Sequence, residues 1–176
     1  LWEFYDYQVN ELKAIHADPH PGNFLFYENG NIGVIDFGCI KRIPLDFYNN
    51  YFQLLNPSYQ QDDKLLLELF YKLEFIYEND TPEAKKLFFD LFKETMFLLI
   101  QPFKDEEFDF SNKAYLDRLY EVGDELKSRK DIRKNGAARG SRHILYINRT
   151  YFGLFTMLYE LGAKVNTTTS FDFSKA

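Results

Sequence analysis

The chain has 176 residues, of which 45% are hydrophobic and 19% aromatic, so it can bury the core of a single domain. Its net charge of −6 argues against binding to nucleic acid, because a polyanionic partner requires a concentrated positive field. Cys39 is the one cysteine of the sequence, which excludes an intramolecular disulfide and favours a reducing, cytoplasmic compartment. We therefore predict one domain over residues 1–176 that has no nucleic-acid partner.

Neither a transmembrane segment nor a signal peptide is predicted. The longest strongly apolar stretch, Thr150 to Tyr159, is much shorter than the roughly 20 residues that span a bilayer. The sequence opens at Leu1 in a helical pattern of apolar residues, without the charged and apolar regions of a signal peptide. We expect the chain to be a piece of a longer protein.

The N-terminal part is predicted to form a helix, a loop and a hairpin. Apolar residues at helical spacing predict a helix from Leu1 to Ile15, and the proline-rich run from Asp18 to Gly22 then breaks it. Two short apolar runs follow, Asn23 to Tyr27 and Asn31 to Asp36. They are separated by Glu28, Asn29 and Gly30, and Asn-Gly is the strongest short signal for a hairpin turn.

The remainder, after Pro44, is predicted to be helical. Apolar periodicity and capping residues indicate helices over Leu45 to Leu55, Leu65 to Ile76, from Thr81 onward, Ser111 to about Lys127, and Ser141 to Gly162. Thr81, Ser111 and Ser141 are the expected N-caps, and Gly162 is the expected C-terminal glycine. The predicted fold class is mainly α, with one small β-hairpin on a helical bundle.

The densest chemical signal is the octapeptide from His16 to Asn23, followed thirteen positions after Asn23 by Asp36-Phe37-Gly38. Pro19 and Pro21 are expected to hold the residues before them in extended conformations, which stiffens the loop. Gly22 and Gly38 are expected to adopt backbone angles closed to other residues. His16 is expected to anchor the loop through backbone hydrogen bonds.

A carboxylate, an amide five residues later and a second carboxylate on the returning strand supply hard oxygen ligands suited to Mg²⁺ and nucleotide phosphates. Protein kinases use this arrangement: the first Asp orients or deprotonates the attacking hydroxyl, while the Asn and the later Asp hold the metal ions. By this template Asp18 is a catalytic residue, and Asn23 and Asp36 are metal ligands. His20 replaces the catalytic-loop lysine and is predicted to act with these three residues in binding Mg-ATP.

Two plainer interpretations compete with the kinase-like one. In the first, Asp18 and Asn23 merely cap turns of an ordinary hairpin, which leaves the proline-stiffened loop unexplained. In the second, His16, Asp18, His20 and Asp36 bind Zn²⁺ or Mn²⁺ in a hydrolytic centre. That interpretation gives Asn23 no role, and the prolines prevent the helix on which the two histidines would share a face.

The octapeptide, together with Ile35 to Gly38, resembles the signature of the UbiB/AarF (ADCK-type) atypical kinases. The run Asn148 to Thr150 with Gly153, and Leu161 to Val165, resemble the terminal helix of that family, whereas about Asn56 to Arg133 matches only in helical character. The resemblance implies the C-terminal lobe of a protein-kinase-like fold, linked to isoprenoid-lipid or quinone metabolism. It also implies ATPase activity more than protein phosphorylation.

Departures from ordinary protein kinases narrow this expectation. Ala17 stands where those enzymes place an arginine that clamps a phosphorylated activation segment. Five residues separate Gly38 from Pro44, and no Ala-Pro-Glu element follows, so a small molecule, a lipid or water is favoured over a peptide as acceptor. Elements of an N-lobe, such as a glycine-rich loop, are not found in the sequence, so the chain alone is expected to be nearly inactive.

Two other functions remain open from sequence. One is a pseudokinase scaffold or lipid-binding regulator, which binds nucleotide without phosphoryl transfer. The other is a small-molecule phosphotransferase similar to aminoglycoside or choline kinases, whose loops usually lack His-Pro-Gly before the Asn.

Three further features are noted. The basic run from Lys127 to Arg142 is interpreted either as a solvated connection between helices or as a peripheral membrane site for anionic lipid headgroups. Cys39 is expected to be a small buried residue, with a position near the nucleotide as the alternative. His143 belongs to no motif and is expected at the surface.

Overall fold

The computed structural model describes residues 1–128 and 139–172. Its N-terminal part contains α1 (Trp2–Asn10), β1 (Ala14–His16), the 3-10 turn η1 (Pro21–Asn23), β2 (Phe24–Phe26), β3 (Ile32–Val34) and β4 (Ile40–Arg42). The larger part contains α2 (Leu45–Phe52), η2 (Gln53–Leu55), α3 (Pro57–Gln61), α4 (Asp63–Lys72), α5 (Pro82–Leu99), η3 (Gln101–Phe103), β5 (Glu107–Asp109), α6 (Lys113–Ser128), α8 (Arg142–Glu160) and β6 (Lys164–Asn166). The fold is mainly helical, as predicted, and it also contains small sheets.

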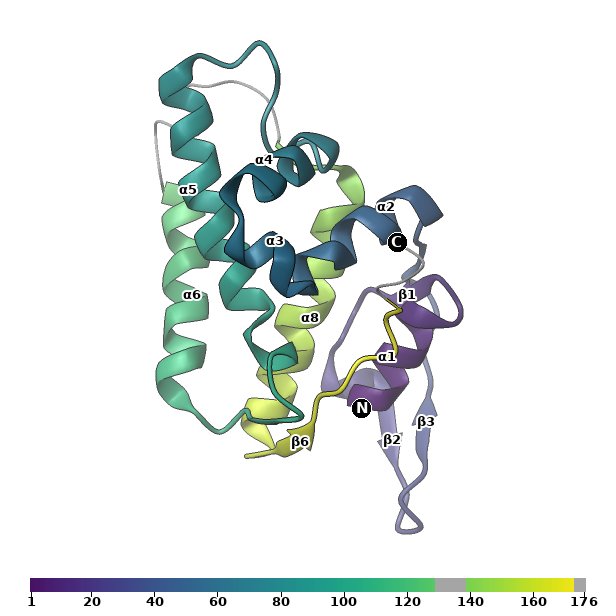
Figure 1. Cartoon of the computed structure of the whole chain (residues 1–176). Helices are drawn as coiled ribbons and strands as arrows, with labels where there is room; N and C mark the ends of the chain where they lie inside the picture. The colour runs from purple at the N-terminus through teal and green to yellow at the C-terminus, as the bar shows by residue number, and fades with distance from the viewer. Residues whose placement is uncertain (129–138, 173–176) are drawn as a thin grey trace.

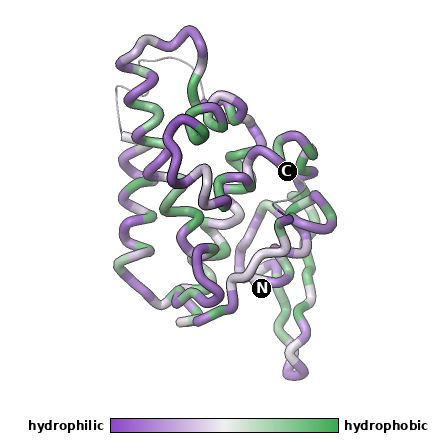
Figure 2. The backbone as a smooth tube through the Cα atoms, in the orientation of Figure 1, coloured by the Kyte–Doolittle hydropathy of each residue, from purple (hydrophilic) through white to green (hydrophobic). Residues whose placement is uncertain are grey.

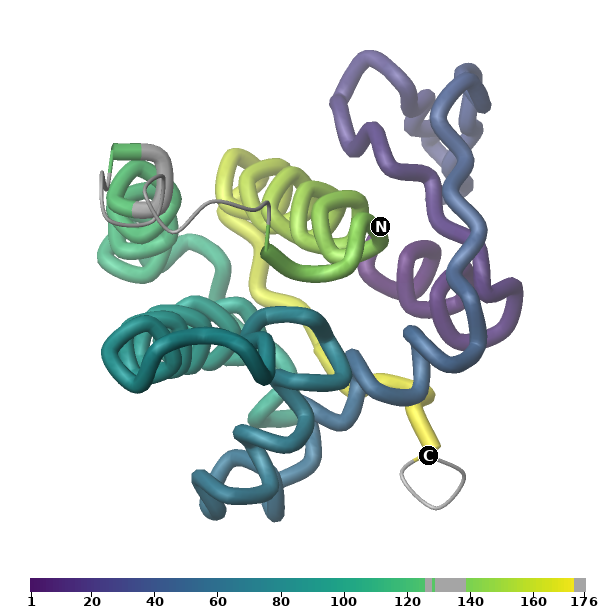
Figure 3. Tube along the Cα trace, turned by 90° about the horizontal axis from the view of Figure 1, so that it is seen from above, coloured from purple at the N-terminus to yellow at the C-terminus, as the bar shows by residue number. Residues whose placement is uncertain are grey.

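Helices α5, α6 and α8 run side by side, and the hairpin of β2 and β3 extends on the other side of α8 (Figure 1). Seen from above, the three long helices occupy the corners of a triangle, and the N-terminal segment lies beyond α8 (Figure 3). Helix α8 therefore stands between the other long helices and the segment that carries the motifs.

The expected hairpin is present, with Phe24 opposite Val34 and Phe26 opposite Ile32. Gly30 in its turn has φ +82°, which explains the glycine there. The strands are hydrophobic and the turn is hydrophilic in Figure 2.

The prediction of a single hairpin is wrong, because two further antiparallel pairs form. Strand β1 pairs with β4, and β5 pairs with β6. The partners are far apart in sequence, and local turn signals do not reveal such pairing. The first helix also ends at Asn10 rather than Ile15, because Lys13 has φ +48° and the chain then enters β1.

Three of the four predicted capping residues are confirmed. The Thr81 hydroxyl accepts a hydrogen bond from the Ala84 amide (3.2 Å), and the Ser141 hydroxyl accepts one from the His143 amide (3.4 Å). Ser111 was expected to cap α6, but the side chain of Asn112 accepts from the Ala114 amide instead. Gly162 ends α8 with φ +57°, as expected of a C-terminal glycine.

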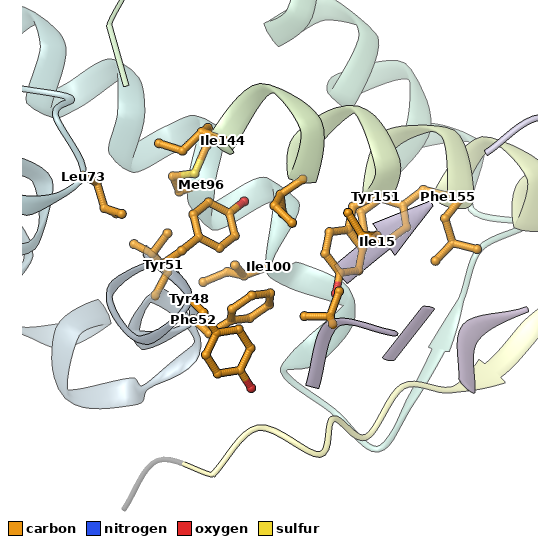
Figure 4. Packing of buried hydrophobic residues seen from close by; sticks show 14 of the residues in the cluster. Ile15, Tyr48, Tyr51, Phe52, Leu73, Met96, Ile100, Ile144, Tyr151 and Phe155 are labelled. Atoms are coloured by element: carbon orange, nitrogen blue, oxygen red, sulfur yellow. The ribbon is translucent and has the colours of Figure 1, made fainter. Parts of the chain in front are cut away.

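Buried side chains from both parts of the chain form one cluster, from Ile15 in β1 to Tyr151 and Phe155 in α8. Figure 4 shows Ile15 close to Tyr151 and Phe155, with Tyr51, Phe52 and Ile100 nearby. Within the described residues, none of the helices has the length and apolar character needed to cross a membrane. The core therefore contains residues of both the motif-bearing segment and α8.

Candidate functional site

The β1–β4 pair brings the two sequence motifs together. His16 lies opposite Ile40, and the amide of Ala17 donates to the carbonyl of Cys39 at 2.8 Å. The start of the octapeptide is thus held beside the segment that follows Asp36-Phe37-Gly38.

His16 ties these segments together more closely. Its side chain is buried, and its Nε2 donates to the backbone carbonyl of Asp36 at 2.6 Å. Its backbone amide donates to the Gln8 side chain of α1 at 2.8 Å. These contacts are those expected of a histidine that anchors the loop.

The carboxylate of Asp18 is held from two sides. The Asn23 side-chain nitrogen donates to Asp18 Oδ2 (3.1 Å) and to the Asp18 carbonyl (2.9 Å). Arg149 Nη2, from α8, donates to Asp18 Oδ1 at 2.8 Å. Each oxygen of the Asp18 carboxylate therefore has its own hydrogen-bond partner. Arg149 supplies a positive charge next to the loop, in which Ala17 replaces the arginine of ordinary protein kinases.

The orientation of Asn23 decides which of its atoms could bind a cation. Its amide nitrogen must face Asp18, because both atoms it contacts there are acceptors. Oδ1 is left as the amide atom suited to a hard cation.

His20 is extended, with φ −124° and ψ 136°, as the flanking prolines predicted. Its Nδ1 accepts a hydrogen bond from the Gly22 amide at 3.1 Å, so Nε2 is the ring nitrogen directed to other partners. The prediction for Gly22 is wrong, because its φ is not positive. A Cβ at this position would lie 3.0 Å from Nδ1 of the exposed His20 ring, so a larger residue would require that ring to shift.

Asp36 and Asn23 lie at the same end of the hairpin, since the Ile35 amide donates to the Asn23 carbonyl at 3.1 Å. Asp36 is exposed, and its Oδ1 accepts from the Gly38 amide at 2.7 Å. Gly38 also lacks the expected positive φ; instead, a Cβ there would lie 3.1 Å from Asp36 Oδ1. Phe37 is 65% exposed beside this carboxylate.

Helix α8 approaches the loop at a second point, one turn after Arg149. A Cβ on Gly153 would lie 2.4 Å from Pro19 Cγ and 3.0 Å from the Pro19 carbonyl oxygen. Arg149 and Gly153 are four residues apart, so they share a face of the helix. In the sequence both residues belong only to the resemblance, and no contact is predicted for either of them.

The alternative hydrolytic metal centre has no support in the structure. Among residues 1–128 and 139–172, no group of three or more His, Cys, Asp and Glu side chains is placed to hold a metal ion. His16 uses Nε2 on a backbone carbonyl, and His20 uses Nδ1 on a backbone amide. Asn23 Oδ1 and the exposed Asp36 carboxylate are compatible with a cation that takes further ligands from phosphate.

Burial and a nearby negative charge raise the pKa of Tyr5, which lies near the site. Tyr5 of α1 is fully buried, and burial, with a further contribution from the negative charge of Asp18, raises its pKa far above the usual value. Its hydroxyl is buried without a hydrogen-bond partner. Tyr5 therefore stays neutral beneath the Asp18 loop.

His143 and Cys39 differ in how they match expectation. His143 was predicted at the surface, but it is half-buried with its ring 5.3 Å from that of Phe47. Burial lowers its pKa, and the nearby charges of Lys41 and Arg142 lower it further. Cys39 is half-buried and packs against the core, which fits the expected small buried residue better than a residue exposed to a nucleotide.

Most of the basic run from Lys127 to Arg142 lies outside the residues that the structure describes. Its role, as a solvated connection or as a site for anionic lipid headgroups, therefore stays a prediction. Arg139 is not a solvated residue of this run. Its guanidinium is buried in a double hydrogen bond with Asp80, with Nη2 to Oδ1 at 2.7 Å, and stacks 3.7 Å from the Phe88 ring centre.

Two comparisons with known proteins find similarity to atypical and probable protein kinases. Residues 1–70, which include Asp18, His20, Asn23 and Asp36, match the model of the ABC1 atypical kinase-like domain. Over 171 residues the chain is 22% identical to the "Probable serine/threonine-protein kinase abkA" of Dictyostelium discoideum. That match covers 96% of this chain and 30% of the length of the relative. The segment that carries the candidate site is thus similar to an atypical kinase-like domain.

Proposed function

We propose that this chain is the C-terminal lobe of an atypical kinase-like protein and supplies the metal- and phosphate-binding half of an ATPase or phosphotransferase site. The observation that carries the proposal is the clustering of Asp18, Asn23 and the Asp36 segment. Asn23 bonds to Asp18 directly, and it meets the Asp36 strand through the Ile35 amide. The template of kinase-like phosphoryl transfer requires these three groups in this order.

The residue roles follow from the atoms that remain available. Asn23 Oδ1 and the carboxylate of Asp36 would hold Mg²⁺, which offsets phosphate charge when bound. His20 would direct Nε2 at a phosphate oxygen, since Nδ1 is occupied. The Asp18 carboxylate would orient the attacking hydroxyl or water and accept its proton.

In this proposal Arg149 orients the Asp18 carboxylate through a direct contact. A guanidinium nitrogen 2.8 Å from Oδ1 makes a charge-assisted hydrogen bond that fixes the orientation of the carboxylate plane. Asp18 would then be presented in a fixed orientation rather than as a freely rotating side chain.

The acceptor is proposed to be water or a small or lipidic molecule rather than a peptide. Strand β4 begins two residues after Gly38 and pairs with β1, so the short segment before Pro44 forms sheet instead of a peptide-docking platform. The link to quinone or isoprenoid-lipid metabolism comes from the resemblance alone. The name of the Dictyostelium relative favours a protein acceptor instead, and acceptor screening would distinguish the two.

A second lobe is proposed to cover the site from the hairpin side, in the same polypeptide or on a partner chain. Large apolar residues of the hairpin and its flanks are 44–65% exposed there: Leu25, Phe26, Tyr27, Ile35, Phe37 and Ile40. Exposed apolar residues gathered on one segment favour an interaction surface there. ATP would bind between that lobe and the Asp18 loop.

The test is Mg²⁺-dependent ATP hydrolysis by a protein that joins this chain to a kinase-type ATP-binding lobe. Asp36→Asn keeps the shape of the side chain but removes its charge, and it is expected to lower turnover by at least about a hundredfold, or 2.7 kcal/mol. Asp46→Asn, at an exposed position on α2, is the matched control and should leave turnover unchanged. Undiminished hydrolysis by Asp36→Asn would contradict the proposal.

A nucleotide-binding scaffold without phosphoryl transfer is the second candidate. The ion pair between Arg149 and Asp18 favours it, because it occupies one oxygen of the proposed base. Saturable Mg-ATP binding that Asp36→Asn weakens, with no turnover on any acceptor, would select this candidate.

A further inference from the structure

A groove of about 360 Å³, open to solvent, is lined by α5, α6 and α8. Arg149 of α8 is one of its lining residues. Its walls are mostly apolar, from Leu98 and Leu99 of α5, Leu119, Tyr120 and Val122 of α6, and Leu145 and Phe152 of α8. Tyr120 and Phe152 meet edge to face with ring centres 5.0 Å apart. The volume falls in the range of sites for small ligands, roughly 300–1,000 Å³.

Gly123 of α6 lies at the wall of the groove and leaves space for a larger side chain. It lies within α6 and lines the groove, and a Cβ there would meet nothing within 4 Å. A helical glycine costs about 1 kcal/mol relative to alanine. Neither a positive φ nor a close helix contact explains Gly123, in contrast to Gly153 against Pro19. Gly123 borders the open space of the groove.

The polar residues that line the groove indicate the charge of the ligand that would bind there. Asn148 accepts a hydrogen bond from Tyr51, and Thr95 donates to its own helix, so both are used within the protein. Asp124 also lines the groove and makes an interaction of its own. Arg149 is the one cation in the described lining; its side chain is 63% exposed, and its contact with Asp18 uses Nη2.

We propose that this groove binds a single-chain amphiphile, with the hydrocarbon body along the apolar walls and an anionic head group at Arg149. The head group would share the guanidinium with Asp18, so the groove and the candidate site are coupled. The binding itself is independent of the proposed function; only the effect of the coupling on catalysis rests on it.

The test uses dodecanoate, dodecanol and dodecyltrimethylammonium below their micelle concentrations, titrated into the 176-residue chain by calorimetry. Dodecanoate should bind about tenfold more tightly than the alcohol, and the cationic probe most weakly. Arg149→Gln should reduce dodecanoate to the affinity of the alcohol. Absence of saturable binding, or equal affinity for the three probes, would overturn the proposal.

Two variants locate the site. Gly123→Leu places a side chain in the open space and should weaken dodecanoate binding by at least about tenfold without loss of thermal stability, because leucine is a better helix former. Leu145→Asp, at a residue that is 72% exposed, should weaken it through charge repulsion. Ala114→Leu, an exposed position on α6 outside the groove, is the control. Wild-type affinity in both groove variants would contradict the assignment.

The coupling has its own readout, which requires no turnover. Asp18→Asn removes the competing carboxylate and should strengthen dodecanoate binding about threefold, whereas Asp46→Asn should not. If the protein with both lobes hydrolyses no ATP but dodecanoate still binds, the proposed function is wrong and the groove proposal stands. Hydrolysis without dodecanoate binding would reject the groove alone.

Discussion

Gly153 in α8 lies directly against Pro19, so closely that a Cβ on Gly153 would be 2.4 Å from the ring carbon Cγ and 3.0 Å from the Pro19 carbonyl oxygen. This contact sets the distance between α8 and the loop that presents Asp18. It also places Arg149, one turn earlier, within hydrogen-bonding distance of that carboxylate.

Gly153→Ala is therefore expected to destabilise the protein, because the added methyl group pushes α8 away from the loop. Overpacking of this kind costs about 1–3 kcal/mol, of which about 1 kcal/mol is recovered through helix propensity. Chemical denaturation measures the difference. Gly123→Ala is the matched control in α6 and should stabilise by about 0.5–1 kcal/mol, since nothing lies within 4 Å of its Cβ. An equal, stabilising effect of both variants would contradict the close contact.

Arg149→Gln should leave the unfolding free energy within about 0.5 kcal/mol of wild type, because exposed ion pairs contribute little. The side chains of Arg149 and Asp18 are 63% and 41% exposed. If Arg149 orients Asp18, turnover in the complete site should fall about tenfold with unchanged Mg-ATP affinity. An increase in turnover would instead show that the ion pair restrains Asp18. Arg142→Gln, an exposed arginine at the start of the same helix, is the control.

Arg139→Met should destabilise the protein by about 3–5 kcal/mol, because it leaves Asp80 buried without its cation. The two side chains are only 6% and 10% exposed. Hydrogen bonding from Arg139 also lowers the pKa of Asp80. The double variant Arg139→Met with Asp80→Leu should recover most of the loss, since it removes both charges together. Equal destabilisation in the single and double variants would argue against the pair.

His143 predicts a dependence of stability on pH. Its pKa in the folded protein lies below the ordinary value of 6.5, so the unfolded chain binds the proton more readily. Stability should therefore fall as the pH drops below about 6.5, where the unfolded chain takes up a proton that the folded chain binds only at lower pH. His143→Phe should reduce this loss between about pH 7 and pH 5. Denaturant midpoints across that range are the measurement, and His20→Phe, at an exposed position, is the control.

Local features of the sequence determined the helical class, the hairpin and the identity of the candidate residues. Asn-Gly signals a turn, Thr81 and Ser141 cap helices, and Pro21 holds the preceding His20 extended, because each effect acts within a few residues. The motif around Asp18 and Asp36 could be found for the same reason, since its chemistry depends on residue type and spacing.

Only the tertiary structure decided how these residues meet. The pairing of β1 with β4 places His16 against the Asp36 carbonyl, although the two strands are separated by the whole hairpin. Arg149 reaches Asp18 from α8, which follows more than a hundred residues later in the chain. Such contacts depend on the burial of a common core, and residue spacing does not encode them. Gly153 is required for the same reason, since its need for a bare Cα arises from Pro19 and not from its neighbours in the helix.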